Sequence, residues 1–445
     1  MEDIIERHRA FAKSGRNRSA SFRISRLEGL RKALADYREE ILAALYSDLR
    51  KPEMEAYASE FSPVIHEIDR AKRHLRRWMR PRRKGRGRSV VPTPYGAALI
   101  IGTWNYPVQL TLSPLVAAIA AGNGATVKPS ELAPATAEVL RNLLQATFEP
   151  DAVAVELGGP DVAAALVDSG YDKVFFTGSP RVGALVAESA AKHHSDVTLE
   201  LGGKSPAIVG SAGNLEFAAK RIAWGKFLNA GQTCLAPDYV LVPTELADAV
   251  VRELEKATRE FFGSDPSQSP DLGRLVNERH FDRLTALLDA AGVSTETNRE
   301  ELFISPTVVR CGTESPLMGE ELFGPILPVG NYGSFDELAA IVHRHRDPLA
   351  TYVFTKDRAF ERRVIRELDF GGGMVNDVIL HAVDPRLPFG GRGSSGTGAY
   401  HGKYGFETFS HQKGIIRRRQ GRAASLRFPP YGRLPSFVRK MMFGV

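Results

Sequence analysis

Cys234 is the residue of this chain whose surroundings most favour chemistry. It ends the run NAGQTC at residues 229–234, in which small and loop-forming residues precede the thiol. A thiol presented in a turn is open to a substrate and can act as a nucleophile once it loses its proton. A lone cysteine is, however, more often a small buried hydrophobe. The second cysteine, Cys311, follows the strand-like residues 307–310, and we interpret it as structural.

Glu200 is a candidate general base. It stands between two leucines in the run LELGG at residues 199–203. In an apolar pocket the pKa of a carboxyl group rises, which suits the group to take up a proton near neutral pH. An ion pair with Lys204, four residues later, is the alternative that the sequence leaves open.

A glycine turn at residues 176–183 is a candidate anion site. The segment reads FTGSPRVG, as a strand, a turn and the start of a helix. Such a turn directs backbone N–H groups and the positive end of the helix toward a phosphate, here around Gly178, Ser179 and Gly183. The segment lacks both the lysine of a P-loop and the full GxGxxG of a Rossmann turn. A purely structural turn is the alternative.

Lys128 and Glu131, in the run KPSE, follow the strand-like residues 125–127. A cation and a carboxylate at the end of such a strand can hydrogen-bond the ribose hydroxyls of a dinucleotide. The same run also reads as the start of a helix, with Ser130 as the N-cap and Glu131 in the first turn. The two interpretations are compatible.

The elements expected around these residues are those of an α/β protein. Apolar residues spaced by three, four or seven predict helices over residues 4–80. From residue 97 onward short apolar runs alternate with helix-like segments, which predicts βαβ units and a parallel sheet. Ligands bind at the carboxyl ends of such strands, so the loops 102–107, 128–131 and 178–183 are the places to look.

A second alternating stretch, from residue 205 to about 387, predicts a second α/β domain. The glycine-dense residues 388–398 that follow, PFGGRGSSGTG, are expected to form a functional loop where backbone approaches a ligand or another strand. A chain of 445 residues is long enough for two or three such units.

The composition excludes several classes of protein. Hydrophobic residues make up 43% of the chain and charged residues 25%, as in ordinary globular domains. Two cysteines and no signal-peptide pattern predict a reducing, cytoplasmic setting. No apolar run approaches the roughly 18 to 20 residues that span a bilayer. No group of His, Cys and Asp has the spacing of metal ligands, so no metal is expected.

The net charge of +7 is unevenly placed, because residues 70–88 are strongly basic and residues 417–419 add three arginines. Such runs can contact nucleic acid or anionic lipid. No recognised nucleic-acid module accompanies them, so we expect no nucleic-acid partner and assign the charge to a solvated surface or a subunit contact. The basic and apolar tail, residues 435–445, is expected either to cover a substrate entrance or to associate with a membrane; a disordered end or a dimer contact is the alternative.

Several of these runs occur in the order that is typical of the aldehyde dehydrogenase superfamily, which the chain resembles. The matching runs are GTWNYP at 102–107, KPSE at 128–131, FTGS at 176–179, LELGGK at 199–204, GQTC at 231–234, EELFGP at 320–325 and the glycine loop after Pro388. The runs CLAPDY at 234–239 and YHGKYGF at 400–406 make the chain similar to the class-3 branch, the group of fatty and aromatic aldehyde dehydrogenases. Arg392 and the pair Pro180-Arg181 are departures that bear on cofactor binding.

The resemblance implies a reaction and a set of roles. Cys234 would be the nucleophile that forms a thiohemiacetal and then a thioester, Asn105 the oxyanion donor, and Glu200 the base that activates water. The cofactor would be NAD or NADP, and the product a carboxylic acid. The residues implied to hold the cofactor are Lys128 and Glu131 at the adenosine ribose, Gly178, Ser179 and Gly183 at the pyrophosphate, Glu321 at the nicotinamide ribose, and Phe323 beside it.

The same resemblance implies a fold and an assembly. It predicts a Rossmann-like NAD(P)-binding domain, a second α/β catalytic domain and a small β arm for bridging and oligomerisation, in a homodimer. The expected boundaries are 1–74 and 89–204 for the NAD(P)-binding domain, 205–387 for the catalytic domain, 75–88 and 404–425 for the bridging segments, and 426–445 for the tail.

Three alternatives stay open at the level of the sequence. A CoA-acylating aldehyde dehydrogenase would hand its thioester to a thiol and would not need Glu200. A cofactor-independent thiol hydrolase would need a histidine beside Cys234. A non-catalytic structural or membrane-surface protein would have no use for Cys234, Glu200 and Asn105 together. The expected substrate is an aromatic or a medium- or long-chain aliphatic aldehyde.

Overall fold

The computed structural model describes residues 2–211, 214–418, 429 and 436–443 of the chain. The chain divides into two units. Unit 1 comprises residues 1–80 and 92–411, and unit 2 comprises residues 81–91 and 412–445. All of the predicted site residues lie in unit 1.

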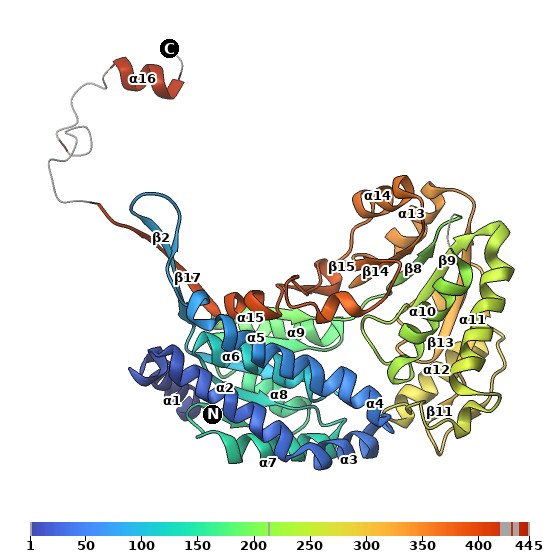
Figure 1. The fold of residues 1–445 in the computed structure, drawn as a ribbon, viewed down its shortest axis with the longest axis horizontal. Coiled ribbons are helices and arrows are strands. Elements are labelled where there is room, and N and C mark those ends of the chain that lie inside the picture. Colours follow the sequence, from blue (N-terminus) through green and yellow to red (C-terminus); the bar gives the residue numbers. More distant parts are fainter. Residues whose placement is uncertain (1, 212–213, 419–428, 430–435, 444–445) are drawn as a thin grey trace. The chain divides into compact units, whose positions relative to one another are not determined.

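Helices occupy the N-terminal part of unit 1, so the helical prediction for residues 4–80 is confirmed (Figure 1). They are α1 (Glu2–Lys13), α2 (Ala20–Asp36), α3 (Arg38–Leu49), α4 (Glu53–Ala56) and α5 (Ser62–Trp78). A π-helical turn, Tyr57–Phe61, joins α4 to α5 and buries the carboxylate of Glu60. The apolar face that the spacing indicated is buried, with Leu27 and Leu45 fully inaccessible.

The first sheet of unit 1 has the strand order β16-β7-β6-β3-β4-β5. Its parallel strands are β3 (Ala97–Ile101), β4 (Gly124–Lys128), β5 (Val153–Val155), β6 (Lys173–Thr177) and β7 (Asp196–Glu200); β16 (Gly396–Thr397) runs antiparallel to β7. The helices between them are α6 (Gln109–Ala121), α7 (Pro134–Thr147), α8 (Pro160–Val167) and α9 (Pro180–Lys192). The chain builds outward from β3 to β5 and then returns to β6 on the other side of β3, which is the switch point where such sheets bind ligands.

The second sheet of unit 1 has the order β12-β13-β9-β8-β14-β15, and all of its strands are parallel. They are β8 (Pro206–Val209), β9 (Tyr239–Pro243), β12 (Thr307–Arg310), β13 (Ile326–Tyr332), β14 (Ala350–Phe354) and β15 (Gly372–Val375). The helices of this part are α10 (Leu215–Phe227), α11 (Ala247–Phe262), α12 (Glu278–Ala290), α13 (Phe335–Arg344) and α14 (Arg358–Glu367). A short hairpin of β10 (Thr297–Asn298) and β11 (Phe303–Ile304) precedes β12. The predicted α/β fold class, with a Rossmann-like first part, is confirmed.

Helix α15 (Gly402–Thr408) closes the C-terminal part of unit 1 against α5 and α6. The rings of Trp78 and Phe406 lie 5.8 Å apart at this contact, and Phe175 of β6 packs edge-to-face on Tyr400 at 5.0 Å. The segment that carries the run YHGKYGF is therefore fixed to the first sheet and to the N-terminal helices.

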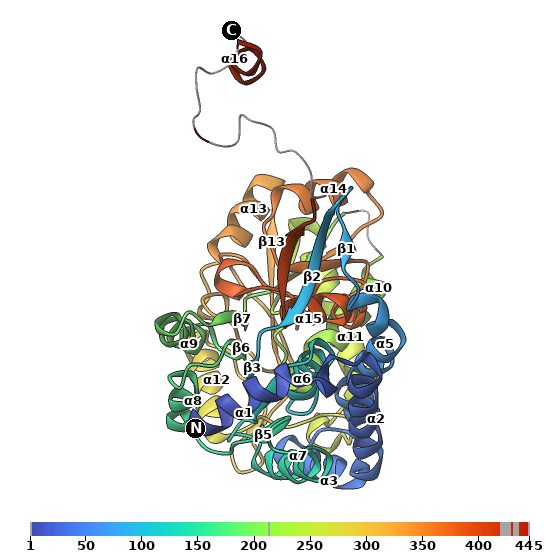
Figure 2. The ribbon, with the colours of Figure 1, turned by 90° about the vertical axis from the view of Figure 1, so that its left-hand side faces the viewer.

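A three-stranded sheet of order β1-β2-β17 forms the small β arm (Figure 2). Its strands are β1 (Arg82–Arg83), β2 (Arg88–Pro94) and β17 (Ser410–Ile416), and β1 pairs antiparallel with β2. Within unit 2, Arg82 donates a hydrogen bond from Nη2 to Oε1 of Gln412 at 2.8 Å. Helix α16 (Ser436–Phe443) is the other described element of unit 2. Over the described residues, we find no helix that combines the length and the apolar character needed to span a bilayer.

Candidate active site

Cys234 follows a loop whose backbone is held in an unusual conformation. Asn229 and Ala230 both have a φ of 54° and Gly231 a φ of 77°, in the left-handed region that side chains other than glycine seldom adopt. A Cβ on Gly231 would lie 2.2 Å from the carbonyl oxygen of Gly324, so only glycine fits there. The loop therefore packs directly on the EELFGP run, and Cys234 beyond it is half-buried.

Gln232 anchors this loop from inside the fold. Its side chain is fully buried; Nε2 donates to the carbonyl oxygens of Asn229 at 3.1 Å and Arg274 at 2.9 Å, and Oε1 accepts from the N–H of Val276 at 2.9 Å. The neighbouring Thr233 shares a hydrogen bond of 2.6 Å with the hydroxyl of Tyr106. These contacts hold the residues before Cys234 rigidly, as a positioned nucleophile requires.

Asn105 lies beside the same loop. Its Nδ2 donates a hydrogen bond to the carbonyl oxygen of Gln232 at 3.0 Å, and its own carbonyl oxygen accepts from Nζ of Lys51 at 2.9 Å. Lys51 forms a fully buried ion pair with Glu60 of the π-helical turn. The predicted oxyanion donor thus lies next to the cysteine loop, and its amide has one protein acceptor.

Glu200 ends β7 with a buried side chain. Neither carboxylate oxygen has a hydrogen-bond partner among the described residues, and burial raises the pKa of Glu200 well above its ordinary value. The alternative ion pair with Lys204 is absent, because Lys204 bonds to Asp238 instead. An unpaired buried carboxyl group is costly for the fold and is expected at a site of proton transfer.

The pKa of the Cys234 thiol reflects these neighbours. Burial raises it to about 12, and the charges of Glu321 and Glu200 push in the same direction, while the N–H groups of Cys234 and Leu235 oppose them. Two carboxyl groups therefore lie close enough to Cys234 to act on its charge. Among the described residues, the groups that act most strongly on the thiol are carboxyl groups and backbone amides, and not the histidine that a thiol hydrolase would need.

Glu321 reaches the Gly-Gly pair that follows Glu200. A Cβ on Gly202 would lie 2.2 Å from Oε2 of Glu321, so a side chain at this position would displace the carboxylate. Burial raises the pKa of Glu321 to about 8, helped by the charge of Asp238 and opposed by a hydrogen bond from the N–H of Gly203. Glu200, Cys234 and Glu321, far apart in the sequence, thus converge on one region.

A buried ion-pair network holds the turn that carries Glu321. Nζ of Lys204 donates to Oδ2 of Asp238 at 2.6 Å and to the carbonyl oxygens of Leu317 at 2.9 Å and Glu320 at 2.7 Å. The N–H of Leu322 donates to Asp238 at 3.2 Å. Sequence reasoning missed this role of Lys204 and Asp238, although both stand in the motif runs LELGGK and CLAPDY, which was the available signal.

Phe323 contacts the turn of Asn105 through Trp104. The Trp104 ring lies 5.4 Å from that of Phe323, edge-to-face, and 5.2 Å from that of His280. Phe323 has a φ of 51°, a strained value that its surroundings must stabilise. The aromatic contact therefore links the oxyanion turn to the Glu321 turn, and Trp104 and His280 are site residues that the sequence did not single out.

The glycine turn lies at the switch point of the first sheet. Ser179 caps α9, its Oγ accepting from the N–H of Val182 at 3.4 Å, and the N–H of Gly178 donates to the carbonyl oxygen of Glu200 at 3.0 Å. A Cβ on Gly183 would lie 2.6 Å from Leu201. The turn therefore lies at the N-terminal end of α9, next to Glu200 in the sheet.

Lys128 and Glu131 lie at the end of β4 and are paired with each other. Nζ of Lys128 donates to Oε2 of Glu131 at 2.8 Å and to the carbonyl oxygen of Pro129 at 3.0 Å. The expectation that a helix starts at Ser130 is wrong, because α7 begins at Pro134 and residues 131–133 form a turn. A proline at the first helical position lacks the N–H that a helix start leaves unpaired, which favours the later start. The carboxylate of Glu131 thus lies in a turn, where it pairs with Lys128, and not in the first turn of a helix.

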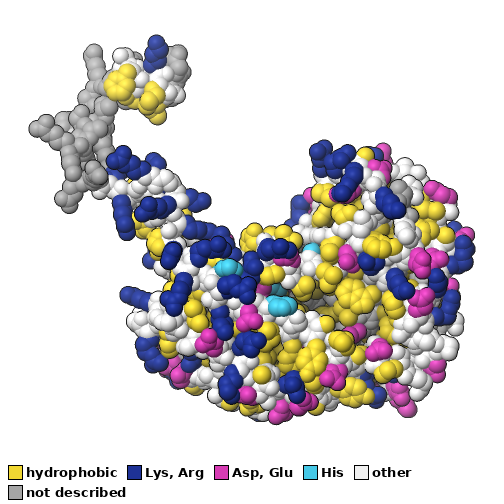
Figure 3. Space-filling view, viewed as in Figure 1, with side chains coloured by type: hydrophobic (Ala, Val, Ile, Leu, Met, Phe, Trp, Pro, Cys, Tyr) yellow, Lys and Arg dark blue, Asp and Glu magenta, His cyan; other side chains and the backbone are white. Residues whose placement is uncertain are grey.

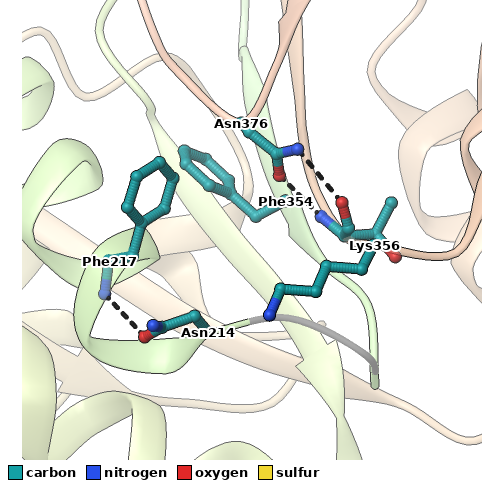
Figure 4. A pocket seen from close by; sticks show the side chains of 6 residues that line it. Asn214, Phe217, Phe354, Lys356 and Asn376 are labelled. Atoms are coloured by element: carbon teal, nitrogen blue, oxygen red, sulfur yellow. Dashed lines mark hydrogen bonds between the residues drawn. The ribbon is translucent and has the colours of Figure 1, made fainter.

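A separate pocket of about 200 Å³ lies at the carboxyl ends of β8, β14 and β15 (Figure 4). It is lined by Asn214, Phe217, Phe354, Thr355, Lys356 and Asn376. Asn376 accepts from the N–H of Thr355 at 2.9 Å, and Asn214 accepts from the N–H of Phe217 at 3.1 Å. None of the predicted site residues lines this pocket, so it is not part of the candidate active site.

The fold and the convergence of cysteine and carboxyl groups define an α/β protein with a candidate thiol active site, and the sequence comparison gives its family. A sequence profile described as "Aldehyde dehydrogenase family" matches residues 1–415. The chain belongs to the aldehyde dehydrogenase family, which confirms the resemblance and the prediction of an enzyme that oxidises aldehydes. Membership also confirms NAD or NADP as the cofactor class. No group of three or more His, Cys, Asp or Glu that could hold a metal occurs in the described part of the chain.

Individual relatives support the class-3 branch. The chain is 43% identical over 435 residues to the "4,4'-diaponeurosporen-aldehyde dehydrogenase" of Staphylococcus aureus, covering 95% of both chains. It is 42% identical to the mouse "Aldehyde dehydrogenase family 3 member A2", over 97% of this chain and 91% of that one. The solved structure "Substrate bound state of Staphylococcus Aureus AldH" superposes with a TM-score of 0.92 at 42% identity, covering 97% and 96% of the two chains.

Proposed function

We propose that this protein oxidises a hydrophobic aldehyde to the carboxylic acid through a covalent intermediate on Cys234. The observation that carries the proposal is the convergence on Cys234 of the Asn105 turn and of two carboxyl groups, Glu200 and Glu321, with raised pKa values. A thiol, an amide donor and a buried carboxyl group are the parts that oxidation through a thioester needs.

The first half of the reaction forms a bond to sulfur. After its proton has passed to solvent, Sγ of Cys234 adds as a thiolate to the carbonyl carbon. Nδ2 of Asn105 and the N–H of Cys234 donate to the alkoxide that develops on oxygen. A nicotinamide cofactor supplies the acceptor for the hydride that leaves this carbon, and a thioester on Cys234 results.

The second half releases the acid. Glu200 first gives up its proton to solvent, since only its carboxylate form can act as a base. It then takes a proton from water as the water oxygen adds to the thioester carbon. The C–S bond breaks, the sulfur regains a proton, and the product is a carboxylic acid. Glu200 argues against a CoA-acylating enzyme, in which a thiol would take the place of water.

The proposed cofactor contacts follow from the same sheet. The Gly178–Gly183 turn would hold the pyrophosphate, with Ser179 at the helix start. Lys128 and Glu131 would contact the adenosine ribose, and their ion pair would open or share its hydrogen bonds when they do so. Glu321 would contact the nicotinamide ribose, with Phe323 beside it. Lys128 favours a 2′-phosphate and Glu131 opposes it, so either NAD or NADP fits.

The central test removes the nucleophile. Cys234→Ala should reduce formation of reduced cofactor from an aldehyde to background, while cofactor still binds. Cys311→Ala, which alters a half-buried cysteine packed against the second sheet, is the matched control and should keep most of the activity. Turnover by Cys234→Ala at a rate near that of the control would rule out the assignment. A panel of aldehydes of graded chain length and aromaticity, with each cofactor, then identifies the substrate class.

We further propose a homodimer and a peripheral contact of the C-terminal tail with lipid. The β arm supports the first, because β17 is an edge strand with exposed Ile415 and Ile416. Helix α16 supports the second, because exposed Phe437 and Met441 lie one helical turn apart beside Lys440. We accordingly propose that the protein is cytoplasmic and associates with a membrane surface.

A further inference from the structure

Lys51 and Glu60 form an ion pair in the interior of unit 1. Charged side chains lie over the face of the molecule that Figure 3 shows, where water solvates them. Both side chains of this pair are inaccessible to water, and Nζ of Lys51 donates to Oε1 of Glu60 at 2.5 Å. Taking two charges out of water costs free energy, and apolar residues in their place often leave a fold equally stable or more stable. The contacts of the pair, rather than its strength, therefore indicate its role.

Lys51 holds the backbone of the proposed oxyanion donor. Its Nζ donates to the carbonyl oxygen of Asn105 at 2.9 Å and lies 4.2 Å from the centre of the Tyr106 ring. The same carbonyl oxygen accepts a second hydrogen bond, from Nδ2 of Asn229 at 2.9 Å. Lys51, Asn105 and Asn229 are all buried. The peptide group that follows Asn105 is therefore fixed in both position and orientation.

Glu60 holds the far end of the same turn. Its Oε2 accepts from the N–H groups of Val108 at 3.1 Å and Gln109 at 2.9 Å. These N–H groups lie at the start of α6, where a helix leaves its donors without partners of its own. Glu60 belongs to the π-helical turn, an element that is frequent at functional sites. Lys51 and Glu60 thus fix residues 105–109 at both ends.

The side chain of Asn105 is held by the cysteine loop. One N–H of its amide donates to the carbonyl oxygen of Gln232 at 3.0 Å, and Nδ2 of Asn229 reaches the same oxygen at 3.2 Å. The N–H of Asn229 in turn donates to Oε2 of Glu55 at 3.0 Å. An amide nitrogen carries two N–H groups, so the second one of Asn105 can donate to an oxyanion. Its direction depends on the backbone that Lys51 holds.

We propose that Lys51 and Glu60 are positioning residues for the oxyanion donor Asn105. They act through the carbonyl oxygen of Asn105 and the start of α6, and not by touching the substrate. The proposal rests on the proposed function, because the place of Asn105 affects the rate only if its amide stabilises an alkoxide. A misplacement of about 1 Å can slow a reaction on the order of 10²-fold. The pair thus links the N-terminal helices to the chemistry at Cys234.

The test is the variant K51M/E60Q in the full chain. Methionine cannot donate to Asn105, and glutamine still accepts from the start of α6, so neither partner is left as an unpaired buried charge. Single-turnover formation of reduced cofactor from an aldehyde should slow on the order of 10²-fold. The Kd for the cofactor and the alkylation of Cys234 by iodoacetamide should be unchanged, because neither develops an oxyanion. Urea unfolding checks that the variant is folded.

A double-mutant cycle separates positioning from a general structural effect. Asn105→Ala removes the donor and should slow the same step by roughly 10²- to 10³-fold. Added to Asn105→Ala, K51M/E60Q should cause no further loss, because no donor is left to position. E60Q alone, which keeps the hydrogen bond from Lys51 to Asn105, is the milder second variant. It should show a smaller loss, again absent once Asn105 is alanine.

The matched control removes the ion pair of another buried lysine of unit 1. K173M/D196N alters the pair at the amino ends of β6 and β7 and should keep the single-turnover rate of the unaltered chain. It is expected to lose stability to a similar extent, so a loss of rate in K51M/E60Q alone cannot come from a weakened fold.

Four results would overturn the proposal. They are an unaltered single-turnover rate in K51M/E60Q, an equal loss of rate in the control, a further loss of full size in the Asn105→Ala background, and alkylation of Cys234 slowed as much as turnover, which would assign the effect to the thiol. An unaltered rate in Asn105→Ala would overturn the oxyanion role and this proposal with it. The role of Cys234 would then stand, because Cys234→Ala tests it separately.

Discussion

At the scale of the residue, the surroundings of Cys234 favour the protonated form of its thiol. Burial raises the pKa of its thiol to about 12, and Glu321 and Glu200 add to the effect. A thiolate is the nucleophile, so most of the reactivity of the residue is withheld at neutral pH. The neighbouring carboxyl groups, with raised pKa values of their own, are suited to receive protons rather than to stabilise the thiolate.

We therefore predict slow alkylation of Cys234 by iodoacetamide. Below the pKa the thiolate fraction rises tenfold with each pH unit, so the rate should increase about a hundredfold from pH 7 to pH 9. NAD⁺ should accelerate the reaction at fixed pH, because a cationic nicotinamide near sulfur lowers the pKa of the thiol. Intact-mass analysis on a Cys311→Ala background measures the rate. A rate independent of pH over this range would show that the thiol is already ionised.

Glu200→Gln tests the second half of the reaction. The amide is close in shape to the carboxyl group but cannot take a proton from water, so hydrolysis should slow by roughly 10²- to 10⁴-fold. We expect one burst of reduced cofactor and a protein whose mass has increased by one acyl group. Steady turnover near the unaltered rate would assign the base to another residue. If coenzyme A added to the unaltered enzyme diverted the product from acid to acyl-CoA, the acylating alternative would replace hydrolysis.

At the scale of the element, the turn before β13 depends on a buried charge network. Burial raises the pKa of Asp238, but the ammonium groups of Lys204 and Lys226 outweigh burial and hold it below its ordinary value. Lys204 also binds two carbonyl oxygens of the turn that carries Glu321 and Phe323. Loss of Lys204 should therefore alter cofactor binding as well as stability.

We predict that Lys204→Met lowers the free energy of unfolding by about 3 kcal/mol, because it leaves Asp238 buried with one cation. It should also raise the KM for NAD(P), because the Glu321 turn is released. Lys173→Met is the matched control: Lys173 is an equally buried lysine, bonded to Asp196 and Thr198 at the amino end of β6. The control should lose stability and keep its KM, as measured by urea unfolding and initial rates. A KM change of equal size in both variants would reduce the role of Lys204 to general stability.

Sequence patterns predicted the elements better than the contacts between them. Strands β3 and β6 are short apolar runs within the stretch from residue 97 onward for which a parallel sheet was predicted, because the strands of such a sheet are buried on both faces. The start of α7 was placed too early, since Ser130 has the chemistry of an N-cap and only the turn at 131–133 shows that it is not one.

The sequence predicted which residues belong to the site, but it did not predict which of them form hydrogen bonds and ion pairs with one another. The spacing in the sequence suggested an ion pair between Lys204 and Glu200. In the structure Lys204 pairs instead with Asp238, 34 positions away. The left-handed Asn229 and Ala230 were equally beyond prediction, because neither residue type requires that conformation. They precede Gly231, which packs directly on Gly324. Long-range packing, which no local pattern encodes, decides both.

At the scale of the whole molecule, the edge strand of the β arm is the feature that favours association with a second chain. β17 lies at one edge of the three-stranded sheet, and Ile415 and Ile416 are 39% and 66% exposed. An edge strand with exposed apolar side chains is a template for pairing with another chain. Its use in a homodimer would bury these side chains and pair the free backbone groups.

We predict that I415K/I416K converts a dimer into a monomer. Light scattering should give twice the chain mass of 48.8 kDa for the unaltered protein and a single chain mass for the variant, because charged side chains on an edge strand oppose pairing. Ile365→Lys places a lysine at an exposed isoleucine of α14 and should leave the dimer intact. The monomer should retain the circular dichroism of a folded chain, since both isoleucines lie outside the buried clusters of unit 1. A variant that remains dimeric would place the contact between copies on another surface.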